Sequence, residues 1–190
     1  MRIRERRYIP AKDFLSYGAG TPAISQVTGR NLEGLDLDAA GEVGTFYLRL
    51  PYNFDPDHDI GIRVHYTTDS STDGDTFDWV VLWQMVEVDA AIPTGISNAL
   101  DTVISQDTLG ASTAFLNKWT ERGLIDSANV NLKTRAQVEG GVMLLVSIEL
   151  DATDVNIPTE NVWLLGAEVD FNRLDYVGTT DLEQGLTSTL

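Results

Sequence analysis

The sequence predicts an all-β fold, a jelly-roll-like antiparallel β-sandwich with at most one or two short helices. Apolar and polar residues alternate along most of the predicted elements, which is the period of strands that bury one face. The chain of 190 residues contains 16 glycines, and polar, turn-rich segments separate its strands. Helical spacing of apolar residues occurs in only one region, at about 92–107.

Two strands are predicted in the first half of the chain, at 45–50 and 60–67. In 45–50, Phe46, Leu48 and Leu50 share one face, and Tyr47 and Arg49 share the other. In 60–67, one face is apolar and the other is formed by Gly61, Arg63, His65 and Thr67.

Residues 76–88 (TFDWVVLWQMVEV) are apolar at nearly every position. This pattern predicts a central strand that is covered on both faces and, at about 3.3 Å per residue, is roughly 43 Å long. Asp73-Gly74 indicates a hairpin-type turn just before it. In the region after it, 92–107, a short helix and an irregular connection fit equally well.

The second half of the chain predicts a hairpin and a closing strand. Residues 130–138 and 142–150 alternate, and Glu139-Gly140-Gly141 between them supplies residues suited to a tight turn. The closing strand is expected at 162–171. Its expected buried face comprises Trp163, Leu165, Ala167, Val169 and Phe171.

The charge is unevenly distributed and suggests three regions. The chain carries −16 overall, yet residues 1–12 hold five basic residues against one acidic residue. We expect a basic N-terminal arm at 1–20, a single β-sandwich domain at 21–175 and a polar C-terminal tail at 176–190. The arm is either a solvated terminus or docks on an acidic partner surface. Its candidate partner-binding residues are Arg2, Arg4, Arg6 and Arg7.

Composition argues against several classes of partner. The negative charge disfavours nucleic acid, since a phosphate backbone is held by clustered Lys and Arg. No run of about 18 apolar residues is present, so no membrane span is expected. The chain has no cysteine, which excludes a thiol nucleophile and a thiolate metal site. The glycine-rich phosphate-binding motifs and the serine-nucleophile motif are absent, so no cofactor and no enzymatic activity are expected.

The segment FDPDHD at 54–59 is the one candidate metal site. Pro56 cannot donate to a strand ladder, which predicts a connection there. The EF-hand template fails, because Ile60 stands where Gly is required and Tyr66 where the closing Glu should be. A turn is therefore expected, and a bound cation remains the weaker alternative. The candidate ligands are Asp55, Asp57 and Asp59.

The tryptophans and two glutamates are the remaining candidates for function. Trp79, Trp83 and Trp163 lie in apolar patterns and are predicted to be core residues. Trp119, in FLNKWTERG, has polar neighbours and is the one candidate for an exposed platform that binds a glycan or a partner, although packing is the favoured interpretation. Glu149 and Glu168 could form a glycosidase pair, but 29 acidic residues make chance pairs expected.

The order of these segments resembles that of small jelly-roll virion proteins of tailed bacteriophages, the decoration or cement proteins. The resemblance covers about 40–172 and rests on the segments FYLRLPYNFDPDHD, IGIRVHYTT, WVVLWQMVEV, VMLLVSIELDATD and LLGAEVDF. It implies a non-enzymatic protein, made in the host cytoplasm, that binds the major capsid protein on the outer capsid surface as a homotrimer and stabilises the shell. The alternative is a head-fibre or tail-associated module that binds host-surface glycan through Trp119 or the 69–75 loop.

Overall fold

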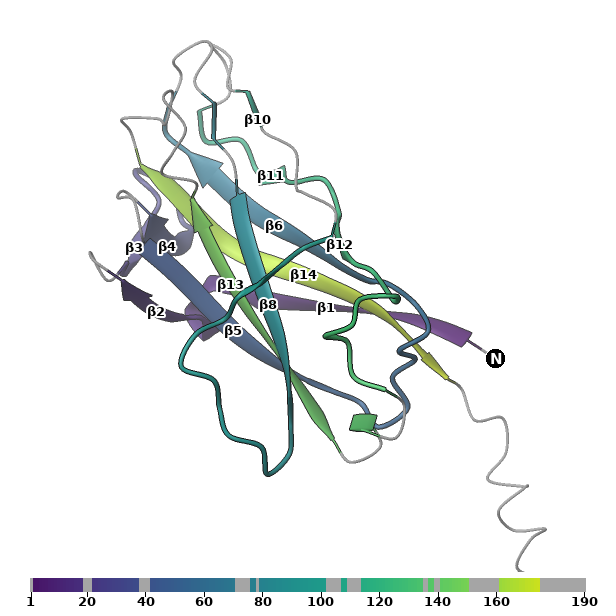
Figure 1. The fold of residues 1–190 in the computed structure, drawn as a ribbon. Coiled ribbons are helices and arrows are strands. Elements are labelled where there is room, and N and C mark those ends of the chain that lie inside the picture. The colour runs from purple at the N-terminus through teal and green to yellow at the C-terminus, as the bar shows by residue number, and fades with distance from the viewer. Residues whose placement is uncertain are drawn as a thin grey trace, which may run out of the picture.

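The computed structural model describes residues 2–18, 22–37, 42–70, 76–77, 79–101, 107–108, 114–134, 137–138, 141–150 and 161–174. These residues form two stacked antiparallel sheets (Figure 1). Among the described residues the only 3-10 helix is η1 (Ala11–Asp13), which joins the sheets at one edge. The predicted all-β sandwich is confirmed. No helix among the described residues is long and apolar enough to cross a membrane.

Sheet A is seven-stranded, and the long strand β14 (Val162–Leu174) is its centre. On one side β14 pairs with β6 (Ile60–Thr68), which in turn pairs with β11 (Lys118–Trp119) and β12 (Gly123–Ile125). On the other side β14 pairs with β4 (Glu33–Leu37), followed by β3 (Ile24–Gln26), and with β1 (Arg2–Pro10).

Sheet B is five-stranded. Its order is β2 (Leu15–Gly18), β5 (Glu42–Leu50), β13 (Val142–Leu150), β8 (Trp79–Glu87) and β9 (Asn98–Ala99). A separate two-stranded sheet joins β7 (Thr76–Phe77) to β10 (Asp107–Thr108). The segment 76–88 therefore contributes two strands, β7 and β8, to different sheets. The prediction of one long strand there was wrong.

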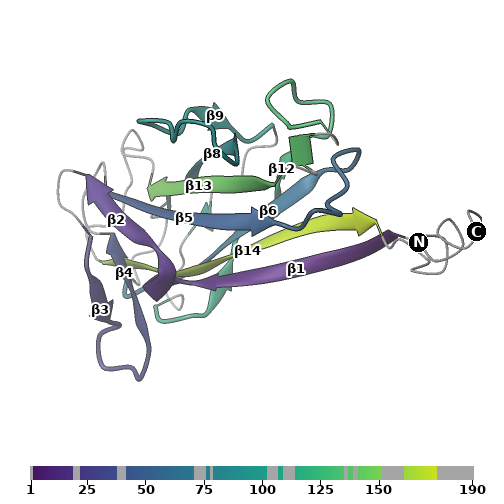
Figure 2. The same cartoon turned by 90° about the horizontal axis from the view of Figure 1, so that it is seen from below.

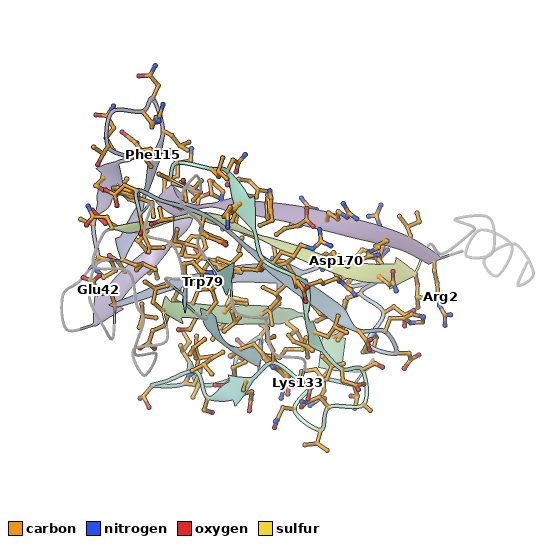
Figure 3. The ribbon with its side chains drawn as sticks, turned by 90° about the horizontal axis from the view of Figure 1, so that it is seen from above. Arg2, Glu42, Trp79, Phe115, Lys133 and Asp170 are labelled. Carbon is orange, nitrogen blue, oxygen red and sulfur yellow. The ribbon has the colours of Figure 1, made fainter. Side chains whose placement is uncertain are left out.

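The core lies between the inner faces of the two sheets. Sheet A contributes Ile60, Ile62 and Val64 from β6, and sheet B contributes Trp83 from β8 and Leu144 from β13. The predicted faces of 45–50 and 60–67 are confirmed, because Phe46 and Leu50 are buried whereas Tyr47 and Arg49 are exposed. Trp79 and Trp83 are buried as predicted, and Trp79 lies in the interior (Figure 3).

The closing strand is interrupted by a β-bulge between Leu164 and Gly166. A bulge inserts one residue and changes which face the next side chain takes. Trp163 and Leu165 therefore belong to a small second cluster with Val27, whereas Ala167 joins the main core. The single apolar face predicted for 162–171 is wrong for this reason, although all five of its residues are buried.

The predicted hairpin of 130–138 with 142–150 is also wrong. Residues 126–132 form turns, Val130 is 93 % exposed, and the amide of Val138 donates to the carbonyl of Thr134 in a helical turn. The amide and the hydroxyl of Thr134 both donate to Gln137 Oε1, at 2.9 and 3.0 Å, which is the glutamine half of a Thr-x-x-Gln capping box. Strand β13 instead lies between β5 and β8. Gly141 has a positive φ of 97°, as the predicted turn required.

Three other predictions concern loops. Residues 92–101 contain no helix, since they form bends and β9, and 102–106 lie outside the described residues. The predicted Asp73-Gly74 turn lies outside the described residues, and of the 69–75 loop only residues 69 and 70 are described. The predicted tail at 176–190 also lies outside the described residues.

The N-terminal segment is a strand rather than an arm that precedes the sandwich. Every residue from Arg2 to Pro10 has an antiparallel partner on β14, and Ile9 joins the core. Figure 2 shows β1 lying alongside β14 over its length. The charge pattern predicted exposure, but alternation puts Ile3, Glu5, Arg7 and Ile9 on one face of the strand, which is the face of β1 that is turned toward sheet B.

Candidate functional site

The outer face of sheet A brings together side chains from distant parts of the sequence. Tyr8 comes from β1, His65 from β6 and Trp119 from β11. Trp119 pairs directly with His65 across the strands, and Gly166 is the β14 partner of His65. These three aromatic residues, Tyr8, His65 and Trp119, are called the aromatic platform below.

The rings of the aromatic platform contact one another. The indole of Trp119 and the imidazole of His65 are parallel, with an interplanar angle of 5° and 4.3 Å between centroids. The ring of Tyr8 meets the indole edge-on at 5.9 Å. Trp119 is nevertheless 43 % exposed. One face of its indole is therefore supported by protein, and the residue still presents aromatic surface to solvent.

Gly166 makes room for Tyr8 on the surface of the sheet. A Cβ at position 166 would lie 2.6 Å from Tyr8 Oη and 2.5 Å from the carbonyl oxygen of Ile9. Without that carbon, the phenol lies over the strand, and its hydroxyl donates to the carbonyl oxygen of Leu165 at 3.0 Å. The β-bulge thus supplies both the glycine beneath Tyr8 and the hydrogen-bond acceptor that fixes it.

Hydrogen bonds hold His65 on both sides. Its Nδ1 lies 2.9 Å from Tyr8 Oη, and its Nε2 contacts Asn117 Oδ1. Burial lowers the pKa of His65 below its ordinary value of 6.5, and the hydrogen bond with Asn117 only partly opposes this. The described burial therefore favours the neutral imidazole of His65 more than exposure to solvent would. Burial also raises the pKa of Tyr8.

We expect titration of the His65 imidazole, followed by NMR, to give a pKa below 6.5. The unfolded chain then takes up the proton more readily, so the stability contributed by neutral His65 is complete above pH 6.5 and declines as the pH falls through the folded pKa. Asn117→Ala should lower the pKa further. A value at or above that of an exposed histidine would contradict the described burial.

Arg63 and Glu168 form a polar row beside the aromatic platform. Arg63 on β6 pairs with Glu168 on β14, which pairs with Tyr8 on β1. The Nε of Arg63 is buried and has no hydrogen-bond partner within the described part of the chain. The carboxylate of Glu168 therefore lies one strand spacing from Tyr8, and the guanidinium of Arg63 lies one strand further on, two residues along β6 from His65.

The opposite end of this face is an ion-pair cluster around Asp170, which is only 3 % exposed. Its carboxylate accepts from Arg122 Nε at 2.8 Å and from Arg4 Nε at 2.7 Å. Burial alone would raise the pKa of Asp170, but the hydrogen bonds and charges of Arg122 and Arg4 outweigh it and lower the pKa. A Cβ at Gly61 would overlap Arg122 Nε and Asp170 Oδ1, so glycine is needed there.

The four arginines predicted to bind a partner have different surroundings. Arg2 lies 3.1 Å from the buried carboxylate of Asp55, at the end of β1 shown in Figure 3, and Arg4 binds Asp170. Arg7 is paired with Glu5 on the inner side of β1. Arg6, on the outer face, forms no ion pair with any other described residue. Whether any of them contacts a partner stays a prediction.

The carboxylates of FDPDHD are directed to different protein partners. Asp55 is fully buried, lies 3.2 Å from His58 Nδ1 and accepts from the amide of Asp57. Asp59 accepts from the amide of Ser127 at 3.0 Å. No group of three potential ligands for a metal ion occurs among the described residues. The predicted turn agrees with the bends and turns seen at 52–58, and the cation alternative gains no support.

Glu149 and Glu168 do not form a pair. Glu149 points outward from sheet B, since Ile148 and Leu150 beside it are in the core, whereas Glu168 points outward from sheet A. The two carboxylates therefore lie on opposite outer faces, and the candidate glycosidase pair was wrong.

Comparisons with known proteins support the fold. No family model and no curated protein matches the sequence. Among solved structures, a xylan-binding module, CBM15, aligns over 88 % of this chain and 97 % of its own, with 12 % identity and a TM-score of 0.51. The C-terminal CBM6 of LamC, from Zobellia galactanivorans, aligns over 87 % of this chain and 98 % of its own, with 10 % identity and a TM-score of 0.44. An infectious bursal disease virus structure aligns over 92 % of this chain and 33 % of its own, with 9 % identity and a TM-score of 0.38. The likeness to CBM15 identifies the shared jelly-roll β-sandwich fold, and the two lower scores support no further conclusion.

Proposed function

We propose that this protein is a non-catalytic binding module that holds a glycan on the outer face of sheet A. The observation that carries the proposal is the aromatic platform, in which Trp119 is 43 % exposed yet stacked on His65. Tryptophan is enriched at binding interfaces, where part of the ring packs on protein and part meets the ligand. The glycan module of a phage head fibre or tail is one setting in which such a domain would act.

The chemistry of the platform suits a sugar ring. The apolar face of a pyranose stacks on an indole face, and the cost of ordering is small because the platform is already held by Tyr8, His65 and Asn117. Arg63 and Glu168 offer a donor and an acceptor to the hydroxyl groups of the next sugar unit. A site of aromatic surface with a few placed polar groups is typical of small-ligand recognition.

The fold gives independent support of a general kind. The CBM15 structure, which is described as a xylan-binding module, shows that a sandwich of this shape can carry a glycan site. The residues of the aromatic platform, and not the likeness, identify the face proposed here.

Trp119→Ala is expected to weaken glycan binding at least tenfold, because stacking on the indole is lost; tenfold corresponds to about 1.4 kcal/mol. The wild-type chain would first be screened against xylan, laminarin and other soluble polysaccharides by affinity electrophoresis, and hits would be measured by calorimetry. Tyr47→Ala is the matched control, since Tyr47 is an exposed aromatic residue on the outer face of sheet B. Equal losses in both variants, or no binding by the wild type, would reject the proposal.

A second candidate is the capsid-decoration role, with the major capsid protein and further copies of this chain as partners. One support is the resemblance in the order of the segments. The other is Arg6, which is exposed and forms no ion pair within the described part of the chain. Under this proposal, Arg6→Glu should weaken binding to capsids that lack the protein. Light scattering would test the trimer separately. Retention of full capsid binding by Arg6→Glu would count against the arginine contact.

A further inference from the structure

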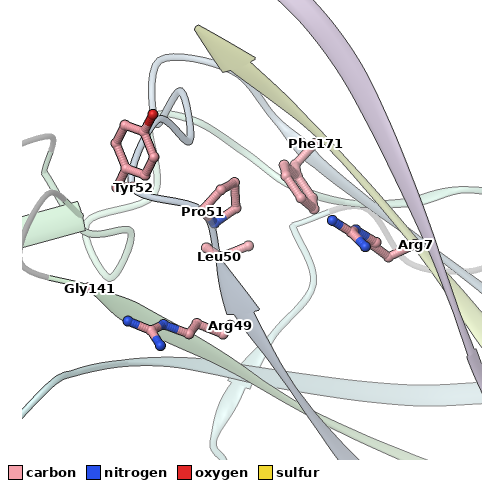
Figure 4. A pocket seen from close by; sticks show the side chains of 7 residues that line it. All are labelled: Arg7, Arg49, Leu50, Pro51, Tyr52, Gly141 and Phe171. Atoms are coloured by element: carbon pink, nitrogen blue, oxygen red, sulfur yellow. The ribbon is translucent and has the colours of Figure 1, made fainter.

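A cleft of about 300 Å³ opens at the side of the sandwich, between the edges of sheets A and B. Arg7 of β1 borders it on one side, and Arg49, Leu50, Pro51 and Tyr52 border it on the other (Figure 4). The ring of Phe171 closes its inner end. Because Arg7 is on the inner side of β1, the cleft is separate from the aromatic platform on the outer face.

The cleft exists because two strand edges are left uncovered there. Strand β2 pairs with β5 only from Glu42 to Thr45, so among the described strands Phe46 to Leu50 pair with β13 alone. Strand β1 likewise pairs with β14 and with no other described strand. Each strand therefore has one edge that no described strand covers, and such an edge offers backbone groups to a ligand.

Positive charge gathers at the cleft, although the chain carries −16 overall. Arg7 and Arg173 share a single carboxylate, that of Glu5, and Arg173 Nε lies 3.4 Å from it. Arg49 is exposed and forms no ion pair with another described residue. Counting only the described residues, three guanidinium groups are thus paired with one carboxylate, which makes this part of the surface attractive to an anion.

The shape and the side chains of the cleft restrict the anion. The planar guanidinium of Arg49 can bind a carboxylate with two parallel hydrogen bonds. Tyr52 is 69 % exposed, and its ring stands beside Pro51 at the mouth of the cleft (Figure 4). A carboxylate attached to a six-membered ring would place its charge on Arg49 and its ring against Tyr52. The volume is at the lower end of the range for ligand sites and fits one such unit.

The geometry points to a second binding site in this cleft, which takes a uronate unit of an acidic glycan. Arg49 holds the carboxylate, Arg7 adds positive charge from the facing strand, and Tyr52 contacts the sugar ring. The site does not use Trp119, His65 or Tyr8, so it stands whether or not the aromatic platform binds a glycan.

Glucuronate and glucose, which differ in the carboxylate, would each be titrated into the ¹⁵N-labelled full chain and followed by NMR. Glucuronate should shift the amides of Arg49, Tyr52 and Gly141, and its affinity should exceed that of glucose at least fivefold. Raising the salt from about 50 mM to about 300 mM should weaken it, because screening of exposed charges increases. Acetate would be a third probe, and it should bind more weakly than glucuronate because it lacks a ring.

Arg49→Gln should lower the glucuronate affinity at least fivefold, and Tyr52→Ala should lower it while leaving acetate unchanged. Arg6→Gln is the matched control, since Arg6 is an exposed arginine on the other side of the same strand as Arg7. Trp119→Ala should have no effect here, which separates this site from the aromatic platform. The assignment would be overturned if glucose or acetate bound as tightly as glucuronate. It would also be overturned if the amide shifts were confined to the aromatic platform, or if Arg49→Gln left the glucuronate affinity unchanged.

Discussion

Deleting residues 1–10 is expected to unfold the sandwich or leave it barely stable. The deletion removes all of β1, which pairs with nine residues of β14. It also removes Ile9 from the core, Arg2 from the buried carboxylate of Asp55 and Arg4 from the buried carboxylate of Asp170, which keeps only Arg122. Burial of one such aliphatic side chain is worth about 1.5–3 kcal/mol, and a buried carboxylate without its partner costs several more. The sum is comparable with the whole stability of a domain, about 5–15 kcal/mol.

Chemical denaturation followed by circular dichroism would measure this loss. The control is Arg6→Gln, which changes an exposed side chain of the same strand and should alter the free energy of unfolding by less than about 0.5 kcal/mol. A deletion variant as stable as the full chain would show that β1 is dispensable. The same reasoning means that partner binding by these arginines has to be tested with point substitutions, since a truncated chain that fails to bind could simply be unfolded.

Asp170→Asn is expected to lower the free energy of unfolding by about 2–3 kcal/mol. The substitution keeps the size of the side chain but leaves Arg4 and Arg122 without their shared charge at a site where the carboxylate is almost fully buried. Both arginines are partly exposed, so the loss should fall below the roughly 3–5 kcal/mol typical of fully buried ion pairs.

The pH dependence provides a second measurement of the same cluster. The pKa of Asp170 is lowered in the folded chain, so its contribution is present above its ordinary pKa of 3.8 and is lost as the pH falls through the folded value. The wild type should therefore lose stability over this acidic range more steeply than Asp170→Asn. Glu168→Gln, on the same face of the same strand, is the control and should resemble the wild type at neutral pH. Parallel pH curves for wild type and Asp170→Asn would contradict the ion-pair assignment.

Much of the fold could be predicted because alternation of apolar residues follows directly from burial of one sheet face. This worked for 45–50, 60–67 and 142–150, whose inner residues are all in or against the core. It failed at 130–138, where the hydrogen bonds from Thr134 to the side chain of Gln137 favour a helical turn over the alternating pattern. It also failed at Trp163, because the β-bulge after Leu164 changes the phase of the strand. The sequence marks this bulge only through Gly166, since a glycine inside a strand often lies at one.

The candidate site could be predicted only in part. The polar neighbours of Trp119 made it a candidate for exposure, although packing was the favoured interpretation, and the indole is in fact both stacked on His65 and 43 % exposed. Its support could not be foreseen, because Tyr8 and His65 are far from it in the sequence and meet it only through the pairing of β1, β6 and β11 in one sheet. Gly61 and Gly166 gave a usable signal, since an outward-facing glycine in a strand often marks a close approach of another group. The basic segment misled the prediction, because its charges mask the alternation that places Ile9 in the core.

The pairing of β1 with β14 also determines when the molecule can be completed during synthesis. Tyr8 and Glu168 are cross-strand partners, so about 160 residues must be added after the first strand before the second one exists. At roughly 5–20 residues per second this takes on the order of 10–30 s on a ribosome. Throughout that time the nascent chain carries a strand without its neighbour, and the last pairing spans nearly the whole chain, which makes folding slow. Capture of the nascent chain by chaperones, and sensitivity of its yield to the rate of translation, follow from this one strand pair.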